Sequence, residues 1–483
     1  MSEVNEQFQN SLDFKVENVR IWPAGTSTGP GAVDMTGTVI TFSYVESITS
    51  PFVAGTMTIL DSAGLLSGLP IQGTENIWIT LKTSSEEDPI VYKMKVWSIN
   101  NRFAKGQKQV YTLGLISGEA IKNETIRVSK PLRGHSDSIV VDLMENYIKT
   151  EKDVFTEVSR FQLNMLPSRR RPFDLITEVC LKSVGEKGVN TTVVKNRRGR
   201  TTQEITETIK GSAGYFFWEN RRGYNFFSVD TLLAEEGSKF RSDSYVSSAW
   251  GPYIERTANT DDVPEVDERS NILQASFGSQ LDVLESLRMG QYGTMIAFFN
   301  HSTGEYEEFL YNAADNYGNM AHLGGQESAE VIWSDDQNDL TGVPSRIMSV
   351  YIDHESWYNG GWPANPEDES AQNPTQFADW QKYYATQALT RYEFLRNQYA
   401  TVQIAGNSAI CAGDLVDLRL ANKLPAEDTK DEPFDKESSG VYLVEEVTHE
   451  YARLENANGR FITTLRLMRD SYGMRDRTST HGQ

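Results

Sequence analysis

The sequence predicts a mainly β protein with an α+β insertion: two antiparallel β-barrel domains plus a middle α+β domain. Three observations support this fold class. Segments with alternating apolar residues recur at roughly ten-residue spacing near the start of the chain. Helical apolar spacing begins near residue 120, and alternating strands return after residue 410. At 483 residues the chain is long enough for about three domains.

The first predicted barrel domain covers residues 1–120. In the segment 76–82, Ile77, Ile79 and Leu81 alternate with polar residues, which is typical of a half-buried strand. Equivalent alternation predicts four further strands, at residues 38–44, 55–61, 92–96 and 111–115. At least five short strands joined by turns indicate a small antiparallel barrel or sandwich.

The middle α+β domain is predicted to cover residues 121–255. One helix follows Ser136 or Asp137 as its N-cap and has an apolar face of Ile139, Val140, Leu143 and Tyr147. Pro172 is expected to begin a second helix, with Ile176, Val179 and Cys180 on one side. The aromatic segment 214–228 predicts a hairpin with two largely buried strands and a polar turn at residues 219–223.

The second barrel domain is predicted to cover residues 256–483, with loop and helix insertions at about 312–398. An acidic linker at 259–268 leads into it. Helices are predicted near 280–289 and at 377–395, and a strand at 294–299. Residues 312–342 and 354–374, rich in Asn, Gly, Asp and Pro, are expected to be long loops. The closing strands are predicted around Val416–Leu420, Tyr442–Val444 and Phe461–Leu465.

Composition narrows the function classes. No apolar run is long enough for a membrane span, and the N-terminus lacks the pattern of a signal peptide. Cys180 and Cys411, the two cysteines, are 231 positions apart, which suits a reducing compartment or a protein indifferent to disulfides. The formal charge of −21 opposes binding to a phosphate backbone. It suits a surface that nucleic acid passes without sticking, or it serves solubility alone.

The segment Gly406–Asp414 (GNSAICAGD) approaches the G-x-S-x-G turn that presents a nucleophilic serine in α/β hydrolases. Ser408, Asp414 and His449 also follow in the order that those enzymes use. That turn needs a helix after the serine, whereas an alternating strand follows Gly413, and the β-branched Ile410 stands where glycine is required. We therefore interpret the segment as a turn between two strands, with glycines for backbone freedom and Asp414 bonding locally.

Other candidate chemistry is weak, and we expect no catalytic, cofactor-binding or metal-binding residues and no cofactor. The six histidines (135, 301, 322, 354, 449 and 481) are scattered without a ligand spacing. The segment Asp335–Leu340 resembles a calcium loop but lacks the glycine at position six and the glutamate at position twelve. The acidic segment Glu427–Asp435 is expected to be an exposed hairpin loop, and no pair of carboxylates is singled out for glycoside cleavage.

Two basic clusters contrast with the acidic background: Arg169–Arg171 and Lys195–Arg200. They are interpreted first as solvated loops and second as contacts for an acidic partner, because the guanidinium fork suits carboxylates. Nucleic-acid binding ranks third, since neither cluster contains interleaved aromatic residues.

Several segments together resemble the central baseplate hub proteins of contractile-tailed phages, the T-even-type hub family. These are Gly406–Val416, Ser439–Tyr451 and Thr463–Asp470 near the end of the chain, the aromatic hairpin Tyr215–Val229, and Gly55–Ser62 in the first predicted barrel. Their order covers most of the chain. Residues 312–374 and 421–438 depart from the family pattern, being longer than expected.

The resemblance implies a structural protein and not an enzyme. It implies a homotrimer whose two tail-tube-like barrels per chain form a pseudo-hexameric ring between the tail tube and the trimeric spike. Its partners would be the spike, tube, tape measure and baseplate wedge proteins. Genomic DNA would pass through the lumen without sequence-specific binding, and net negative charge would concentrate on the lumen face. The expected location is the virion baseplate, after assembly in the host cytoplasm.

Two alternatives stay open. One is a hydrolase acting on cell-wall polymer, although no spare region of about 120 residues carries an acid/base pair. The other is the hub of a related bacterial contractile injection system, which the sequence does not distinguish from a phage.

Overall fold

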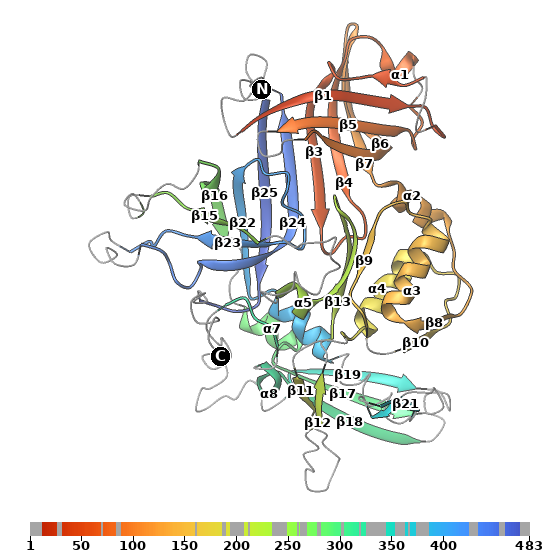
Figure 1. The fold of residues 1–483 in the computed structure, drawn as a ribbon, viewed down its shortest axis with the longest axis vertical. Helices are drawn as coiled ribbons and strands as arrows, with labels where there is room; N and C mark the ends of the chain where they lie inside the picture. The colour runs from red at the N-terminus through yellow and green to blue at the C-terminus, as the bar shows by residue number, and fades with distance from the viewer. Residues whose placement is uncertain are drawn as a thin grey trace.

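The computed structural model confirms a mainly β protein with a large sheet (Figure 1). It describes residues 12–26, 31–68, 71–83, 88–159, 162–185, 190–193, 207–210, 213–233, 249–257, 260, 268–277, 282–300, 304–317, 320–324, 344–352, 363–365, 368–372, 386–424, 433–453 and 459–473.

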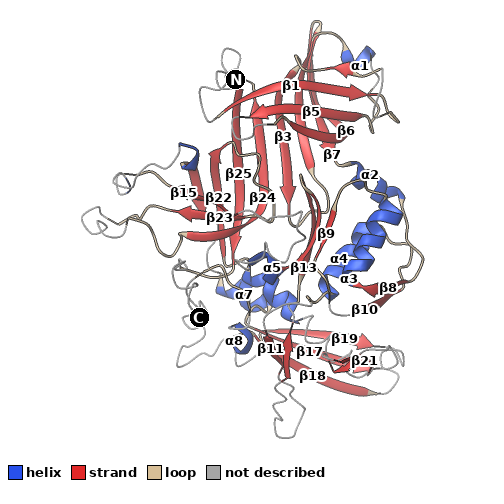
Figure 2. Ribbon diagram, in the orientation of Figure 1, coloured by secondary structure: helices blue, strands red, loops and turns tan. Residues whose placement is uncertain are grey.

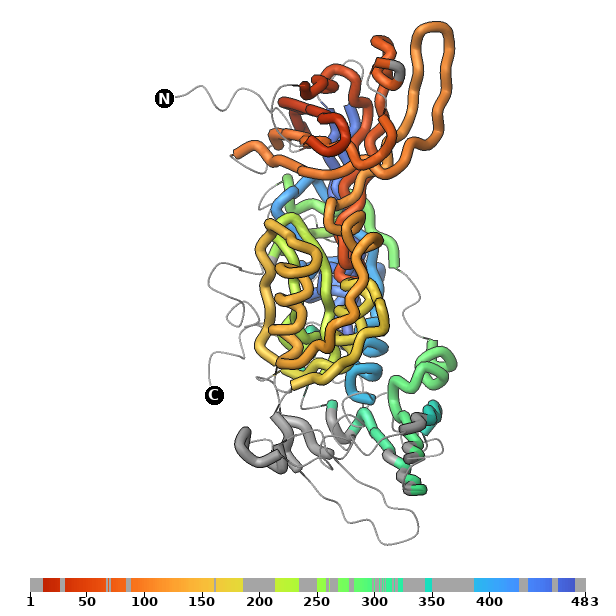
Figure 3. Tube along the Cα trace, turned by 90° about the vertical axis from the view of Figure 1, so that its right-hand side faces the viewer, coloured from red at the N-terminus to blue at the C-terminus, as the bar shows by residue number. Residues whose placement is uncertain are grey.

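The first barrel is a closed circuit of eight antiparallel strands. In order around the circuit these are β24 (Gly440–Ala452), β3 (Val39–Ser47), β4 (Ala54–Asp61), β7 (Lys108–Ile116), β6 (Ile90–Lys105), β5 (Asn76–Thr83), β1 (Asp13–Trp22) and β25 (Gly459–Arg469), which pairs back with β24. The short β2 (Val33–Asp34) pairs with β1, and α1 (Leu65–Gly68) follows β4. The β6–β7 hairpin projects beyond the barrel (orange in Figure 3).

Alternation along these strands fills the barrel with one hydrophobic core. Ile77, Ile79 and Leu81 of β5 are fully buried, as the sequence pattern predicts. The other four predicted strands near the start of the chain are confirmed as β3, β4, β6 and β7. Tyr451 and Phe461, from the far end of the sequence, belong to the same core.

The second barrel uses six strands. β15 (Ala249–Ile254), β23 (Leu415–Arg419), β24, β25, β22 (Gln398–Ala405) and β16 (Ile272–Phe277) lie in this order. A single parallel bridge joins Ile254, the last residue of β15, to Asn271, which directly precedes β16. All its ladders are antiparallel except that between β15 and β23, which is parallel. The predicted closing strands are confirmed here, and Val444, Leu465 and Leu467 lie in this core.

Strands β24 and β25 belong to both barrels (Figure 1). Residues 440–443 of β24 pair with β23 of the second barrel, and residues 446–452 pair with β3 of the first. Within β25, residues 459–460 pair with β1 and residues 462–469 pair with β22. The two barrels are therefore joined by continuous hydrogen-bonded strands.

The middle part of the chain packs helices against a small sheet (Figure 2). Its helices are α2 (Gly118–Thr125), α3 (Ser136–Asp142) continuing into a π-helical turn (Leu143–Ile148), α4 (Pro172–Lys182) and α5 (Val229–Leu233). Its strands are β8 (Leu132–His135), β9 (Val154–Thr156), β10 (Gln162–Met165), β11 (Asn190–Val193), β12 (Glu207–Lys210), β13 (Tyr215–Asn220) and β14 (Gly223–Ser228). The predicted start of α4 at Pro172 and its buried face are confirmed.

Two details of this region differ from the predictions. The N-cap of α3 is His135, not Ser136 or Asp137. Asp137 instead accepts hydrogen bonds from the amide and hydroxyl of Ser159, at 3.0 and 2.7 Å. The predicted aromatic hairpin is confirmed, but its turn is shorter than expected: the ladder reaches Asn220 and Gly223, so only Arg221 and Arg222 form the turn.

The insertion before β22 contains a second, three-stranded sheet. The helix predicted near 280–289 is confirmed as α7 (Val283–Met289). It begins after Asp282, whose carboxylate accepts a hydrogen bond from the amide of Glu285 at 2.9 Å. β17 (Gly293–Asn300) lies between β18 (Glu305–Asn312) and β19 (Arg346–Ile352). A 3-10 turn (Glu268–Ser270) precedes β16.

The segments expected to be loops hold short elements: α8 (Ala314–Tyr317), β20 (Pro363–Asn365) and β21 (Asp368–Gln372). Asn312 starts α8 by accepting the amide of Ala314 at 2.9 Å. Of the helix predicted at 377–395, residues 386–394 are helical, and the part before 386 lies outside the described residues. Most of the acidic linker 259–268 also lies outside them.

Candidate functional site

The segment 406–414 lies where both barrels meet the middle part of the chain. Trp218 Nε1 and Asn220 Nδ2, from the aromatic hairpin, both donate to the carbonyl oxygen of Ala412, at 2.9 and 3.3 Å. The amide of Ala412 donates to Glu46 of β3 at 3.0 Å. We call the segment 406–414 and these three side chains the joint.

Asp414 is the central charge of the joint and is fully buried. The guanidinium of Arg222 binds both of its carboxylate oxygens, at 2.8 and 2.9 Å. Trp250 Nε1 donates to it at 3.0 Å, and the amide of Cys411 donates at 3.1 Å, the local bond that the sequence predicts. A buried carboxylate needs such full pairing, because an unpaired charge in the interior is costly.

Glu46 brings the first barrel into the joint. Its carboxylate accepts the amide of Arg221 at 2.5 Å and the hydroxyl of Tyr44 at 3.0 Å, in addition to the amide of Ala412. Burial raises the pKa of Glu46 to about 7 even though these hydrogen bonds favour the ionised form. The joint therefore fixes the position of three units by hydrogen bonds.

The arrangement around His449 differs from a catalytic triad. His449 is buried in β24, and burial lowers its pKa to about 3, so the ring is neutral. Its Nε2 lies 3.3 Å from the carbonyl oxygen of Ile410 and its Nδ1 lies 3.1 Å from the hydroxyl of Thr463. In a triad, Nδ1 would instead donate to the aspartate. Here the carboxylate of Asp414 accepts its side-chain hydrogen bonds from Arg222 and Trp250.

Replacing Ser408 with alanine is expected to change little. Its buried hydroxyl lies 3.5 Å from that of Thr83, a long hydrogen bond. The expected loss in the free energy of unfolding is at most about 1 kcal/mol, measurable by chemical denaturation. A hydrolytic activity on peptidoglycan that disappears in this variant would contradict the architectural interpretation.

A second buried network holds the insertion against both the middle part and the end of β25. Arg391, in the helical segment 386–394, is fully buried and donates to Asp230 at 2.5 Å and to Asp470 at 3.5 Å. His322 Nδ1 lies 2.6 Å from Asp470, and its ring stacks on Tyr317. The close contact with His322 and the charge of Arg391 hold the pKa of Asp470 well below its ordinary value, outweighing the opposite effect of burial.

Glu157 is the second buried carboxylate whose pKa burial raises to about 7. The folded protein therefore holds this proton more tightly than the unfolded chain, whose glutamate titrates near 4.5. By linkage, stability falls as the pH rises from about 4.5 to about 7, and the full cost is present above pH 7.

Glu157→Gln is expected to remove that cost. The amide oxygen can keep the bond that Glu157 accepts from the amide of Ser228 at 2.8 Å, and the NH₂ can donate to the Ser228 hydroxyl. At pH 8 the variant should be more stable than the native chain by up to about 3 kcal/mol, with no gain at pH 4.5. Urea unfolding at the two pH values measures this, and an equal effect at both would refute it.

The remaining candidate residues are placed as follows. Arg170 forms an ion pair with Glu178, and Arg171 forms ion pairs with Glu124 and Asp174 at 2.7 and 2.9 Å, so these arginines serve intramolecular contacts. Lys195–Arg200, Asp335–Leu340 and residues 427–432 lie outside the described residues. Cys180 and Cys411 are buried free thiols. Within the described ranges, no group of three or more His, Cys, Asp or Glu residues could hold a metal ion.

Two of the charged groups just described could not be found from the sequence. Arg391 and Glu46 are isolated charges in otherwise ordinary segments, and their partners lie up to 161 and 366 positions away. Only the segment 406–414 had a local signal, its two glycines and Asp414.

Among the helices of the described residues, none is long and apolar enough to cross a membrane.

Comparisons with known proteins found solved structures that are similar in overall fold, and their sequence identity to this chain is below 10%. No family model matches the chain, and the search of curated proteins gave no significant match. The chain is similar to the tail protein from Neisseria meningitidis MC58, with 8% identity over 95% of this chain and 97% of that one, and a TM-score of 0.46. It is also similar to the 43 kDa tail protein of prophage MuSo2 from Shewanella oneidensis, with 7% identity over 94% of this chain and 98% of that one, and a TM-score of 0.46.

A third similar structure belongs to an E. coli component of the type VI secretion system. Identity is 9%, coverage is 91% of this chain and 76% of that one, and the TM-score is 0.36. These three solved structures are thus two tail proteins and one secretion-system component.

Proposed function

We propose that the chain is a structural hub of a contractile phage tail or a related bacterial injection machine. Three copies would form a ring with pseudo-sixfold symmetry that joins the tail tube to a trimeric spike. The tube, spike, tape measure and baseplate wedge proteins would be its partners, and the ring would reside in the virion baseplate after assembly in the host cytoplasm.

The observation that carries this proposal is the pair of barrels fused through β24 and β25. Shared strands fix two barrels at a constant distance and angle, which a flexible linker cannot do. Three such chains present six barrels, so one ring can match a sixfold tube on one side and a threefold spike on the other. The sequence resemblance of the segments Gly406–Val416 and Ser439–Tyr451 to phage hub proteins supports the same reading.

The acidic balance supports a conduit for nucleic acid. With 67 Asp and Glu against 46 Lys and Arg, the chain repels a polyanion on average. In the proposed ring, part of this charge would face the bore, and DNA would pass without sequence-specific contact. A trimer with a neutral or basic bore would contradict this part of the proposal.

Mass measurement in solution tests the proposal. Sedimentation velocity of the purified chain is expected to give a species of three times 54.4 kDa. With a spike protein from the same source, that mass should increase by the mass of the bound spike. Electron microscopy of that species should show six barrels around a bore. A chain that stays monomeric with both spike and tube proteins would refute the hub.

A further inference from the structure

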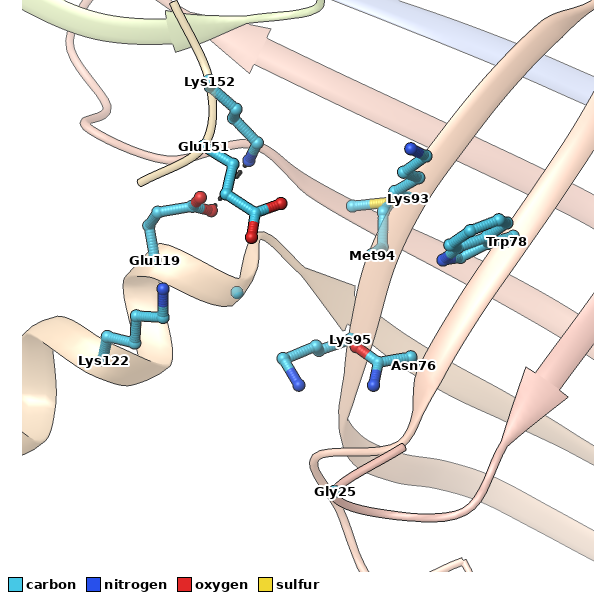
Figure 4. A pocket seen from close by; sticks show the side chains of 11 residues that line it. Gly25, Asn76, Trp78, Lys93, Met94, Lys95, Glu119, Lys122, Glu151 and Lys152 are labelled. Carbon is cyan, nitrogen blue, oxygen red and sulfur yellow. Dashed lines mark hydrogen bonds and ion pairs between the residues drawn. The ribbon is translucent and has the colours of Figure 1, made fainter. Parts of the chain in front are cut away.

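A cleft of about 660 Å³ separates the first barrel from the middle part of the chain (Figure 4). Strands β5 and β6 form one wall, through Asn76, Trp78 and Lys93–Lys95. The start of α2 and the residues before β9 form the other. Its charged lining consists of four lysines and two glutamates (Lys93, Lys95, Lys122, Lys152, Glu119 and Glu151), an excess of two positive charges in a chain with a net charge of −21.

The charges on the second wall are partly neutralised within the chain. Lys152 binds Glu119 at 2.8 Å and also forms an ion pair with Glu219. Thr150 donates a further hydrogen bond to Glu119 at 3.0 Å. This cluster connects α2 to the aromatic hairpin, since Glu219 also accepts the amide of Val53 at 3.1 Å. Lys152 and Glu119 are therefore structural.

Within the described ranges, the other three lysines form no ion pair with a carboxylate. In the described part of the chain, lysine ion pairs belong to Lys152, Lys182 and Lys423. Lys95 donates to the carbonyl of Thr74 at 3.3 Å, and Lys122 donates to that of Lys149 at 2.9 Å. Lys93 lies 4.8 Å from the centre of the Trp78 ring. Their ammonium groups therefore keep capacity for an anionic partner.

Lys95 and Lys122 also repel each other across the cleft. Lys95 is half-buried, and burial together with the charge of Lys122 lowers its pKa, outweighing the opposite effect of Glu119 and Glu75. Figure 4 shows the two side chains reaching toward the cleft from opposite walls. A carboxylate between them would relieve this repulsion, because it interacts favourably with both ammonium groups.

We propose that this lysine cleft receives carboxylate side chains of a second copy of the chain. The inference rests on the homotrimer proposed above and names one contact within it. Three copies with a charge of −21 each repel one another, so assembly needs contacts at which positive and negative groups meet. A cleft with unpaired lysines supplies such a contact. Lysine's point charge without a bidentate fork suits several carboxylate geometries.

The test is charge reversal of Lys95 and Lys122 with a matched control. Lys95→Glu with Lys122→Glu changes the net charge by four units, as does Lys15→Glu with Lys130→Glu at exposed positions outside the cleft. Sedimentation velocity in 50 mM salt is expected to show at least a tenfold weaker trimer for the cleft variant than for the control. In 500 mM salt the difference should shrink, because salt screens the new repulsion.

A variant with neutral side chains distinguishes a local folding defect from the loss of the contact between copies. Lys95→Gln with Lys122→Gln should weaken the trimer less than charge reversal, and the melting temperature of the monomer should match the control. A cleft variant as trimeric as its control would overturn this inference and leave the hub proposal standing. A native chain that never assembles would overturn both. Loss of the folded monomer in the Gln variant would assign the two lysines to internal stability and also overturn the inference.

Discussion

Gly413→Val is expected to destabilise the chain by about 3–5 kcal/mol, enough to remove most of the folded protein, because backbone strain adds to a steric clash. Gly413 has a φ of +90°, a conformation that β-branched residues rarely adopt. A Cβ placed there would lie 2.5 Å from Cζ2 of Trp218. The indole cannot move aside, since it is fully buried and its Nε1 is bound to Ala412.

The control for this variant is Gly64→Val. Gly64 has a similar φ of +75°, but no atom lies within 4 Å of a Cβ placed there. It therefore measures backbone strain alone, at about 1–2 kcal/mol. Thermal unfolding and soluble yield of the two variants provide the comparison. Equal stabilities would mean that Trp218 does not restrict position 413.

Asp470→Ala is expected to cost about 3–5 kcal/mol, because it leaves the buried charge of Arg391 with one carboxylate fewer. Asp470 is fully buried and also accepts the amide of Leu323 at 3.0 Å and the hydroxyl of Ser471 at 3.0 Å. Its removal frees His322 from its closest polar contact at 2.6 Å. Denaturant unfolding measures the loss.

Glu285→Ala supplies the matched loss of one negative charge at the surface. Glu285 is 57% exposed and lies 3.6 Å from Arg396, so its ion pair should contribute less than about 1 kcal/mol. If the two variants lose the same stability, the network around Arg391 does not hold the insertion in place.

The local elements were predictable because their signals are local. Alternation at Ile77, Ile79 and Leu81 depends on one sheet face being buried, which any strand in a barrel satisfies. The start of α4 at Pro172 is likewise decided by a few neighbouring residues. The fold class could thus be inferred from segments considered one at a time.

The joint and the shared strands depend on distant partners and were therefore not predictable. Nothing in residues 440–452 distinguishes a strand of one barrel from a strand of two, because the second partner, β3, lies about 400 positions earlier. Arg391 has the appearance of a solvated residue on an amphipathic helix, and its burial results from Asp230 and Asp470. The glycine of the segment 406–414 that looked like part of a catalytic turn serves close packing: a Cβ at Gly406 would lie 2.0 Å from the ring of Phe461.

The two strands common to both barrels also determine the order in which the chain can fold. Until residues 440–469 have left the ribosome, β1 and β3 each lack one neighbour, so the first barrel remains an open sheet with two exposed edges. Pairing across about 400 positions is slow, because a long loop must close first. A nascent or truncated chain that ends before β24 is therefore expected to aggregate or to need a chaperone, although six of the eight strands of the first barrel have been synthesised by then.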